Sequence, residues 1–263
     1  MARPVIALLT DFGTRDHYAG TMRGVALSIC PDATLVDISH DIPPHDVLAG
    51  ALELAAAYRY FPPGTIFLVV VDPGVGSTRR GIAADTGDYR LVAPDNGVLT
   101  AVLDEQPAKR IVELSERKYA RPTVSRTFEG RDRFAPAAAW LAKGIDLAAL
   151  GRAARTIHRL DLPQAKASEG GIDGQVVRVD RFGNLITNID RRMFERVADG
   201  PLEIRVGAFQ VSQVVSTYAD APAGGVCALF GSTDHLEIAA NGSSAAERLA
   251  LGRGAPVQVV RHA

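Results

Sequence analysis

The stretch that decides the fold of this chain is Val69-Val70-Val71-Asp72-Pro73-Gly74-Val75-Gly76-Ser77-Thr78-Arg79-Arg80. An apolar, β-branched strand ends at an acid, and a turn of proline and glycine then brings two arginines back towards that acid. Open α/β sheets bind their ligands at the carboxyl ends of their strands. We therefore predict that Asp72 and Arg79 form a polar site with a tuned base at such an end. A plain ion pair that closes the strand fits the local pattern equally well.

Short strands and helical segments alternate around this stretch. Ile66–Val71 is apolar throughout, as expected of a strand buried on both faces. The further strands predicted are Val5–Leu9, Thr34–Ile38, Ile82–Asp85, Tyr89–Val92 and Ile111–Leu114, and the helices are Ala19–Ile29, Val47–Tyr60 and Phe134–Lys143. This alternation predicts an α/β domain over residues 1–163, in which a largely parallel sheet lies between two layers of helices as an α/β/α sandwich.

After Pro163 the pattern changes. The small, polar segment Gln164–Gly171 is predicted to be a linker. Short strands follow over Gly174–Val179, Leu185–Ile189, Leu202–Val206, Gln210–Ser216, Val226–Phe230, His235–Ala239 and Val257–Arg261. Short strands separated by turn residues are typical of a small barrel or sandwich. We therefore predict a second, smaller β domain over residues 172–263.

The overall composition argues against several kinds of partner. A net charge of −1 and an isoelectric point near 6.6 give no support for nucleic acid or an acidic membrane surface as a partner. We find no signal-peptide pattern and no apolar run long enough to span a bilayer. Cys30 and Cys227 match no metal spacing and the histidines are scattered, so we expect a reduced, cytoplasmic protein without a metal or other cofactor.

Further segments carry polar groups that a core does not need. In Thr10-Asp11-Phe12-Gly13-Thr14-Arg15-Asp16, two acids follow the first strand, where they suit a ribose diol or an amine. Asp16 is equally suited to cap the next helix. Ala93-Pro94-Asp95-Asn96-Gly97 is most simply a tight turn. The glycine-rich run Gly74–Gly81 has neither the phosphate-loop order nor the dinucleotide-binding order of glycines.

Two more polar segments lie later in the chain. Thr127-Phe128-Glu129-Gly130-Arg131-Asp132-Arg133-Phe134-Ala135-Pro136 is a dense charge cluster that opens a helix. A solvated helix start with Asp132 as its cap is a serious alternative for all of these residues except Glu129. In Asp180-Arg181-Phe182-Gly183-Asn184, the Phe and Asn side chains suit stacking on a base and hydrogen bonding to it, and the same residues also suit a β-turn.

In this order, the motifs TDFG, VVDPGVGSTRR, APDNG, TFEGRDRFAP and DRFGNLITNI resemble those of the S-adenosylmethionine (SAM) hydroxide adenosyltransferases, or SAM hydrolases. These enzymes are related to the fluorinating and chlorinating enzymes that use the same substrate. The resemblance runs from near residue 5 to near residue 245 and implies an N-terminal α/β domain, a C-terminal β-barrel domain and a homotrimer. It implies active sites between one subunit's N-terminal domain and its neighbour's C-terminal domain.

The resemblance also implies a reaction, namely hydrolysis of SAM to adenosine and L-methionine by attack of an activated water or hydroxide at C5′. Asp72 and Arg79 would hold and polarise that water. The halogenating relatives have an uncharged residue where Asp72 stands, and a carboxylate there would repel a halide, so a SAM-dependent halogenase is the poorer interpretation. Glu129 stands where the family usually has a histidine, which leaves the division of labour between Asp72 and Glu129 open.

Substrate-binding roles carry over to the matching positions in the same way. Asp11 resembles the acid that binds the ribose hydroxyls, and Asp16 and Asp180 resemble the acids near the methionine ammonium group. His45 matches an aromatic wall residue of the fluorinating relative, although a plain loop histidine fits equally well. The remaining contacts implied are Phe182, Asn184, Asn241 and Gly242 for the adenine and Ser232 for the methionine carboxylate.

Two other classes of function fit the sequence less well. The chain could bind SAM or adenosine without turnover, which the change at Glu129 permits. It could also be a different nucleoside hydrolase that uses acidic groups and a metal. The absence of a His/Asp cluster with metal-ligand spacing disfavours this last class.

Overall fold

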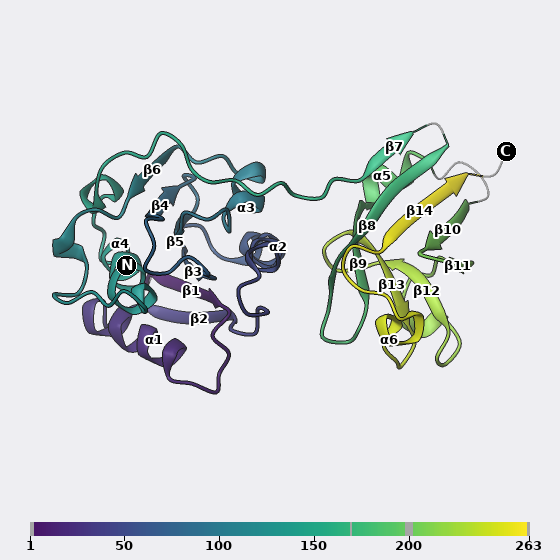
Figure 1. The fold of residues 1–263 in the computed structure, drawn as a ribbon, viewed down its shortest axis with the longest axis horizontal. Helices are drawn as coiled ribbons and strands as arrows, with labels where there is room; N and C mark the ends of the chain where they lie inside the picture. The colour runs from purple at the N-terminus through teal and green to yellow at the C-terminus, as the bar shows by residue number, and fades with distance from the viewer. Residues whose placement is uncertain (1–2, 169, 198–201, 262–263) are drawn as a thin grey trace. The chain divides into compact units, whose positions relative to one another are not determined.

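The computed structural model describes residues 3–168, 170–197 and 202–261. The chain divides into two compact units, Met1–Leu162, called here the N-terminal unit, and Pro163–Ala263, called the barrel unit. Figure 1 shows the helices and strands of each unit. Within the described part of the chain, no helix combines the length and the apolar character needed to cross a membrane.

The N-terminal unit is built on a six-stranded sheet with the order β2-β1-β3-β5-β4-β6. Its strands are β1 (Val5–Thr10), β2 (Thr34–Ser39), β3 (Ile66–Val70), β4 (Gly81–Asp85), β5 (Arg90–Pro94) and β6 (Arg110–Glu113). Strands β2, β1, β3 and β5 are parallel, whereas β4 pairs antiparallel with both β5 and β6. The predicted largely parallel sheet is therefore confirmed.

Helices cover both faces of this sheet because the side chains of its strands alternate between two cores. In β1, Ile6 and Leu8 pack against α1 (Tyr18–Ile29) and α4 (Ala135–Ala142). The intervening Ala7 and Leu9 pack on the opposite face. That second core also contains residues of α2 (Val47–Ala57) and α3 (Thr100–Glu105). The result is the predicted α/β/α sandwich (Figure 1).

The barrel unit contains an eight-stranded antiparallel sheet. Its strands are β7 (Lys166–Ser168), β8 (Gly171–Val179), β9 (Leu185–Asp190), β10 (Leu202–Val206), β11 (Phe209–Val211), β12 (Val226–Phe230), β13 (His235–Ala240) and β14 (Pro256–Arg261). The strands follow the order β11-β10-β14-β8-β9-β13-β12. The sheet nearly closes into a barrel because the chain beyond β11 returns to β12, where the Ala228 amide donates to the Gln213 carbonyl oxygen at 2.8 Å. The predicted β-barrel class is confirmed.

Short elements account for the differences from the sequence prediction. Strand β7 lies inside the predicted linker Gln164–Gly171, and the predicted strand Gln210–Ser216 is replaced by the shorter β11. Helices α3, α5 (Arg191–Glu195) and α6 (Ala245–Leu249) were not predicted, because five or six residues are too few to show a helical period. Single turns of 3₁₀ or π-helix lie at Tyr58–Tyr60, Arg117–Tyr119, Gly130–Phe134, Leu147–Leu150 and Tyr218–Asp220.

Candidate active site

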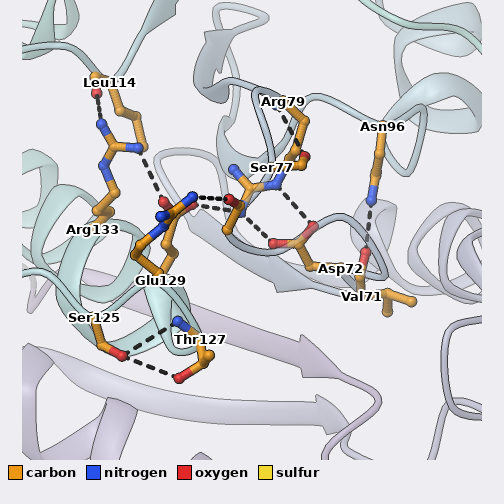
Figure 2. A network of polar contacts seen from close by, with 12 residues as sticks. Val71, Asp72, Ser77, Arg79, Asn96, Leu114, Ser125, Thr127, Glu129 and Arg133 are labelled. Carbon is orange, nitrogen blue, oxygen red and sulfur yellow. Dashed lines mark hydrogen bonds and ion pairs between the residues drawn. The ribbon is translucent and has the colours of Figure 1, made fainter.

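The candidate site of the N-terminal unit begins where two neighbouring parallel strands end. Thr10 of β1 is in register with Val70 of β3, so Asp11 and Asp72 leave the sheet at the same edge. The end of β3 is held by Asn96, whose Nδ2 donates to the Val71 carbonyl oxygen at 2.8 Å (Figure 2). The Asp95-Asn96-Gly97 turn therefore supports the site rather than lining it.

Arg79 joins two carboxylates at this edge. Its Nε donates to Asp72 Oδ1 at 2.8 Å, and its Nη2 donates both to Asp72 Oδ2 and, at 2.5 Å, to Glu129 Oε2. The exposed fractions of these side chains are 5% for Asp72, 10% for Arg79 and 11% for Glu129. Figure 2 shows Glu129 and Asp72 on either side of the guanidinium group. The predicted contact of Asp72 with Arg79 is thus present, and Glu129 joins it from a distant part of the chain.

The guanidinium group of Arg79 is a fixed cation. Burial by itself lowers the pKa of Arg79, but the hydrogen bonds and charges of Asp72 and Glu129 outweigh it and raise the pKa above its ordinary value. The ring of Phe134 lies 5.1 Å from the guanidinium carbon. Among the described residues, Nη1 of Arg79 is a buried donor with no hydrogen-bond partner. That nitrogen suits a small polar ligand such as water.

The loop that returns Arg79 to Asp72 depends on one glycine. Gly76 has a φ of +78°, and a Cβ atom there would lie 2.4 Å from the carbonyl oxygen of Arg126. No other residue fits both the left-handed conformation and this close approach without strain. The Arg79 amide then donates to Ser77 Oγ at 3.2 Å (Figure 2), which directs the arginine side chain back towards the strand end.

Glu129 is positioned by the π-helical turn Gly130–Phe134, which it precedes. Asp132 anchors that turn, because it is fully buried and accepts hydrogen bonds from the Ser125 amide at 2.8 Å and from Arg131 Nε at 2.7 Å. Burial raises the pKa of Asp132, but Arg131 and the Ser125 amide outweigh that effect and lower it. The alternative of Asp132 as a solvated helix cap is therefore wrong.

A cavity of about 290 Å³ opens onto these groups. Its lining residues are Asp11, Phe12, Tyr18, Pro44, His45, Val70, Asp72, Val75, Thr127, Phe128, Glu129 and Gly130. Three aromatic rings form one wall, since the Phe128 centroid lies 5.1 Å from that of Tyr18 and 6.0 Å from that of Phe12. Three carboxylates and an apolar wall thus meet in one pocket, and a few polar groups in an apolar lining are typical of sites for small molecules.

The turn that carries Asp11 is tied down from two sides. The His45 amide donates to Asp11 Oδ2 at 2.8 Å, with His45 itself at a φ of +68°. Beneath the turn, Thr10 Oγ1 and His40 Nδ1 lie 2.8 Å apart, and the Gly13 amide donates to the His40 carbonyl oxygen at 2.7 Å. His40 Nε2 in turn lies 3.0 Å from an oxygen of Asp37. The Asp11 carboxylate is therefore presented on a rigid loop.

In the barrel unit, Asp180 organises the turn that carries the predicted adenine contacts. Its Oδ1 accepts from the amides of Phe182 and Asn184 at 2.9 and 2.8 Å, and its Oδ2 accepts from Asn184 Nδ2 at 2.8 Å. Asn184 is buried, whereas the Phe182 ring is 77% exposed. The turn thus holds Asn184 in place and presents an aromatic ring to its surroundings.

The other predicted residues of the barrel unit lie on two further turns. Ser232 is exposed in the turn between β12 and β13. Asn241 and Gly242 follow β13, and Asn241 Nδ2 donates to the Ala221 carbonyl oxygen at 2.7 Å. The Asn241 amide group therefore braces a neighbouring loop.

With this geometry established, comparisons with known proteins identify the family. Residues 6–151 match the SAM hydroxide adenosyltransferase N-terminal domain, and residues 174–258 match the SAM hydroxide adenosyltransferase C-terminal domain. The chain belongs to the SAM hydroxide adenosyltransferase family. The resemblance predicted from the motifs is confirmed.

Relatives of this chain include both hydrolases and fluorinases. The (R)-S-adenosyl-L-methionine hydrolase of Salinispora tropica is 38% identical over 262 residues, which cover 97% of each chain. A fluorinase of Actinopolyspora mzabensis is 32% identical over 293 residues, which cover 99% of this chain and 98% of the fluorinase. The crystal structure of an uncharacterized conserved protein from Thermotoga maritima shares 36% identity with a TM-score of 0.92, covering 97% of this chain and all of that one.

In this member of the family, the structure brings most of the predicted N-terminal residues together. Asp11, Asp72 and Glu129 line one cavity, with Arg79 bridging the last two. Asp16 is exposed and does not line that cavity. It does not cap α1 either, because the cap position is His17 and that residue makes no side-chain capping bond.

Sequence reasoning missed the aromatic wall and the support beneath Asp11. Phe12 and Phe128 stand directly beside the predicted Asp11 and Glu129, and Tyr18 lies two residues after Asp16, so an aromatic residue near a polar motif was the available signal. His40 gives no such signal, because its contact with Thr10 spans 30 positions. Within residues 3–168, 170–197 and 202–261, no group of three or more His, Cys, Asp or Glu side chains is arranged to hold a metal ion.

The barrel unit also contains a buried acid, whose pKa is affected by the charge of Asp180. Glu237 is 5% exposed, and Tyr218 Oη donates to its Oε2 at 2.9 Å. Burial raises the pKa of Glu237, and the charge of Asp180 adds to that effect while the Tyr218 hydrogen bond opposes it. Burial and the bond to Glu237 together raise the pKa of Tyr218 to about 12. The carboxylate form of Glu237 is thus costly in the folded state.

We expect Glu237→Gln to stabilise the fold more at pH 8 than at pH 4. A carboxyl group whose pKa is raised in the folded state contributes stability below its unfolded pKa and loses that contribution as the pH rises through its folded pKa. The amide keeps an acceptor for Tyr218 and carries no charge. Urea denaturation at both pH values measures the difference, with the exposed Glu195→Gln as the matched control. A stability difference that is the same at both pH values would contradict this account.

Proposed function

We propose that this protein hydrolyses SAM to adenosine and L-methionine. The observation that carries the proposal is the buried group of Asp72, Arg79 and Glu129, which opens onto a cavity that also presents Asp11. The similarity to (R)-S-adenosyl-L-methionine hydrolases over nearly the whole chain supports the same reaction.

The chemistry requires an oriented nucleophile and no acid for the leaving group. A water oxygen forms a bond to C5′ while the C5′–S bond breaks. The electron pair of the C5′–S bond passes to the sulfonium sulfur, which leaves as the neutral thioether of methionine. The water loses one proton to a base. The enzyme therefore has to hold the water in line with the C5′–S bond and to exclude competing solvent.

In this proposal Asp72 is the base and Arg79 orients the water. Asp72 lines the cavity, and a carboxylate keeps free acceptor sites even when each of its oxygens accepts one hydrogen bond. The buried Nη1 of Arg79, which has no partner among the described residues, is the donor available to the water oxygen. Glu129 positions the guanidinium group from the opposite side.

The substrate-binding roles follow the family resemblance. Asp11 is proposed to bind the ribose hydroxyls, and its fixed orientation on the amide of His45 supports a bidentate contact. In the barrel unit, the adenine is assigned to the Phe182 ring and to the turn around Asn184. The other assignments are Asp16 and Asp180 for the ammonium group, Ser232 for the carboxylate, and Asn241 and Gly242 for further contacts to the base.

A homotrimer with active sites at the subunit interfaces is part of the proposal. The cavity is lined by residues of the N-terminal unit, whereas the assigned adenine contacts belong to the barrel unit, so the substrate needs both kinds of unit. The exposed ring of Phe182 also suits contact with a partner. We propose the cytoplasm as the compartment, because the thiols of Cys30 and Cys227 are free and buried and fit a reducing environment.

Asp72→Asn is expected to lower the turnover of SAM by at least about a hundredfold, the usual effect of losing a general base. The amide keeps the shape of Asp72 but cannot accept the proton, so the affinity for SAM should change far less. Chromatography of adenosine and methionine, without added metal or halide, measures the rate. Asp88→Asn in the exposed turn between β4 and β5 is the matched control. Near-normal turnover of the Asp72 variant would exclude this residue as the base.

Asp11→Asn is expected to weaken adenosine binding about ten- to hundredfold, because a hydrogen bond to a charged group is worth about 1.5–3 kcal/mol. Calorimetry with adenosine isolates this effect from the chemical step. The exposed Asp41→Asn should leave the affinity unchanged. An unchanged affinity of the Asp11 variant would remove this residue from the ribose role.

A mixture of two inactive variants tests the shared active site. Asp72→Asn removes the base from the N-terminal unit, and Phe182→Asp places a charge on an exposed position of the barrel unit where the adenine is proposed to stack. If neighbouring subunits build each site, a site is intact only when its N-terminal unit and its barrel unit both lack a substitution. In chains co-expressed in equal amounts and assembled at random, each of these has a probability of one half, so about a quarter of the sites should be active. No recovery, or a solution mass equal to that of one 27.9 kDa chain, would contradict the shared site.

A further inference from the structure

Glu129 has a second guanidinium partner that the proposed reaction does not yet use. Arg133 Nη1 donates to Glu129 Oε1 at 3.2 Å, while Arg79 occupies Oε2 (Figure 2). Arg133 lies four residues after Glu129, within the π-helical turn that Glu129 precedes, and its Nη2 also donates to the Leu114 carbonyl oxygen at 3.3 Å. The two oxygens of Glu129 are thus divided between two cations.

This division matters because of the charges that meet at the site. Asp72 and Glu129 face each other across Arg79, so one guanidinium group alone would leave the buried group with a net negative charge. Two neighbouring carboxylates that share one cation repel each other. Arg133 brings the formal charge of the four groups to zero.

The other side of Arg133 faces β6. Glu113 on that strand forms a hydrogen-bonded ion pair with Arg152. The hydrogen bond from Arg152 lowers the pKa of Glu113, and the charges of Arg80 and Arg133 add to this effect. Arg133 is 33% exposed, less than the 76% of Arg152. Its charge is therefore partly screened by water, yet its Nη1 lies within hydrogen-bond distance of Glu129 Oε1.

We propose that Arg133 is a positioning residue of the water site. By occupying Oε1, it holds Glu129 as a carboxylate with its other oxygen on Arg79, and this leaves Asp72 as the acceptor of the proton from water. Glu129 is bound from two sides by different cations, whereas Asp72 has the guanidinium of Arg79 as its one cationic partner among the described residues. The inference deepens the proposed function and rests on it.

The test is the pH dependence of turnover in Arg133→Met. Removing this charge should move the acid limb of the kcat profile to higher pH by about half a unit to one unit. A close opposite charge can shift a carboxyl pKa by about 1–3 units, but the effect of Arg133 should be smaller because this side chain is partly exposed. At the alkaline plateau, kcat should stay within about threefold of wild type. Arg133→Lys, which keeps the charge, should have its acid limb close to the wild-type position. Arg152→Met is the matched control and should leave the limb in place.

A double-mutant cycle shows whether the effect passes through Glu129. In a Glu129→Gln background, Arg133→Met should move the limb by less than about a quarter of a unit, because the carboxylate that Arg133 controls is gone. An unmoved limb in Arg133→Met, or an equal shift in both backgrounds, would overturn the proposal. Circular dichroism confirms that each variant is folded, and Arg133→Gln, which also removes the charge, carries the test if Arg133→Met is not folded.

A readout without turnover separates this inference from the proposed function. In ¹³C-labelled protein, the Glu129 carboxyl carbon should titrate at higher pH in Arg133→Met than in wild type. If the wild type releases no adenosine from SAM but this titration shifts, the proposed function fails and the role of Arg133 stands. If adenosine is released and the titration does not shift, the role of Arg133 fails alone.

Discussion

The N-terminal site depends on one buried guanidinium group that holds two carboxylates together. Arg79 reaches Asp72 on the loop after β3 and Glu129 on a turn about fifty residues later, so it joins two segments that the sheet alone would leave independent. Such a group is stable only while it is complete, because removing one partner of a buried ion pair leaves an uncompensated charge at a cost of about 3–5 kcal/mol. The conformation of both loops is therefore linked to the charge of the site.

The fold provides the place for this group through the register of parallel strands. β1 and β3 are neighbours and end together, so the acids that follow them, Asp11 and Asp72, share one cavity. The supports lie outside the cavity, with Asn96 on the end of β3 and His40 beneath the Asp11 turn. This separation of supporting and exposed groups lets the polar side chains of the cavity stay available to a ligand.

The sequence predicted those parts of the structure that are encoded locally. The β-branched run of β3, the alternation of strands and helices, and the return of Arg79 to Asp72 all follow from residues near one another in the chain. The remaining features depend on distant contacts. Asp132 resembled a helix cap, but it is fully buried and accepts a hydrogen bond from the Ser125 amide seven residues earlier, and the His40 contact with Thr10 could not be inferred from spacing.

The barrel unit shows the same limit of local reasoning. Regular short strands predicted its class, yet β7 formed within a segment that reads as a linker, because it pairs with β8 rather than following its own propensity. The buried Glu237 has no signal in the sequence, since a lone acid in a strand reads as a solvent-facing residue. Its hydrogen-bond partner Tyr218 lies 19 positions earlier in the chain, beyond the reach of local patterns.

The balance of charge at the site explains why a neutral nucleophile suits this protein better than a halide. Asp72 and Glu129 against Arg79 and Arg133 give a formal charge of zero, so water enters without adding charge, whereas a halide would bring an uncompensated negative charge beside two carboxylates. The sulfonium group of SAM is attracted by the same carboxylates. That attraction weakens as the positive charge on sulfur disappears in the transition state, so a strong excess of negative charge would stabilise the substrate more than the transition state. A cluster held near neutrality avoids this penalty, and in the proposed mechanism it leaves Asp72 as the carboxylate that accepts the proton.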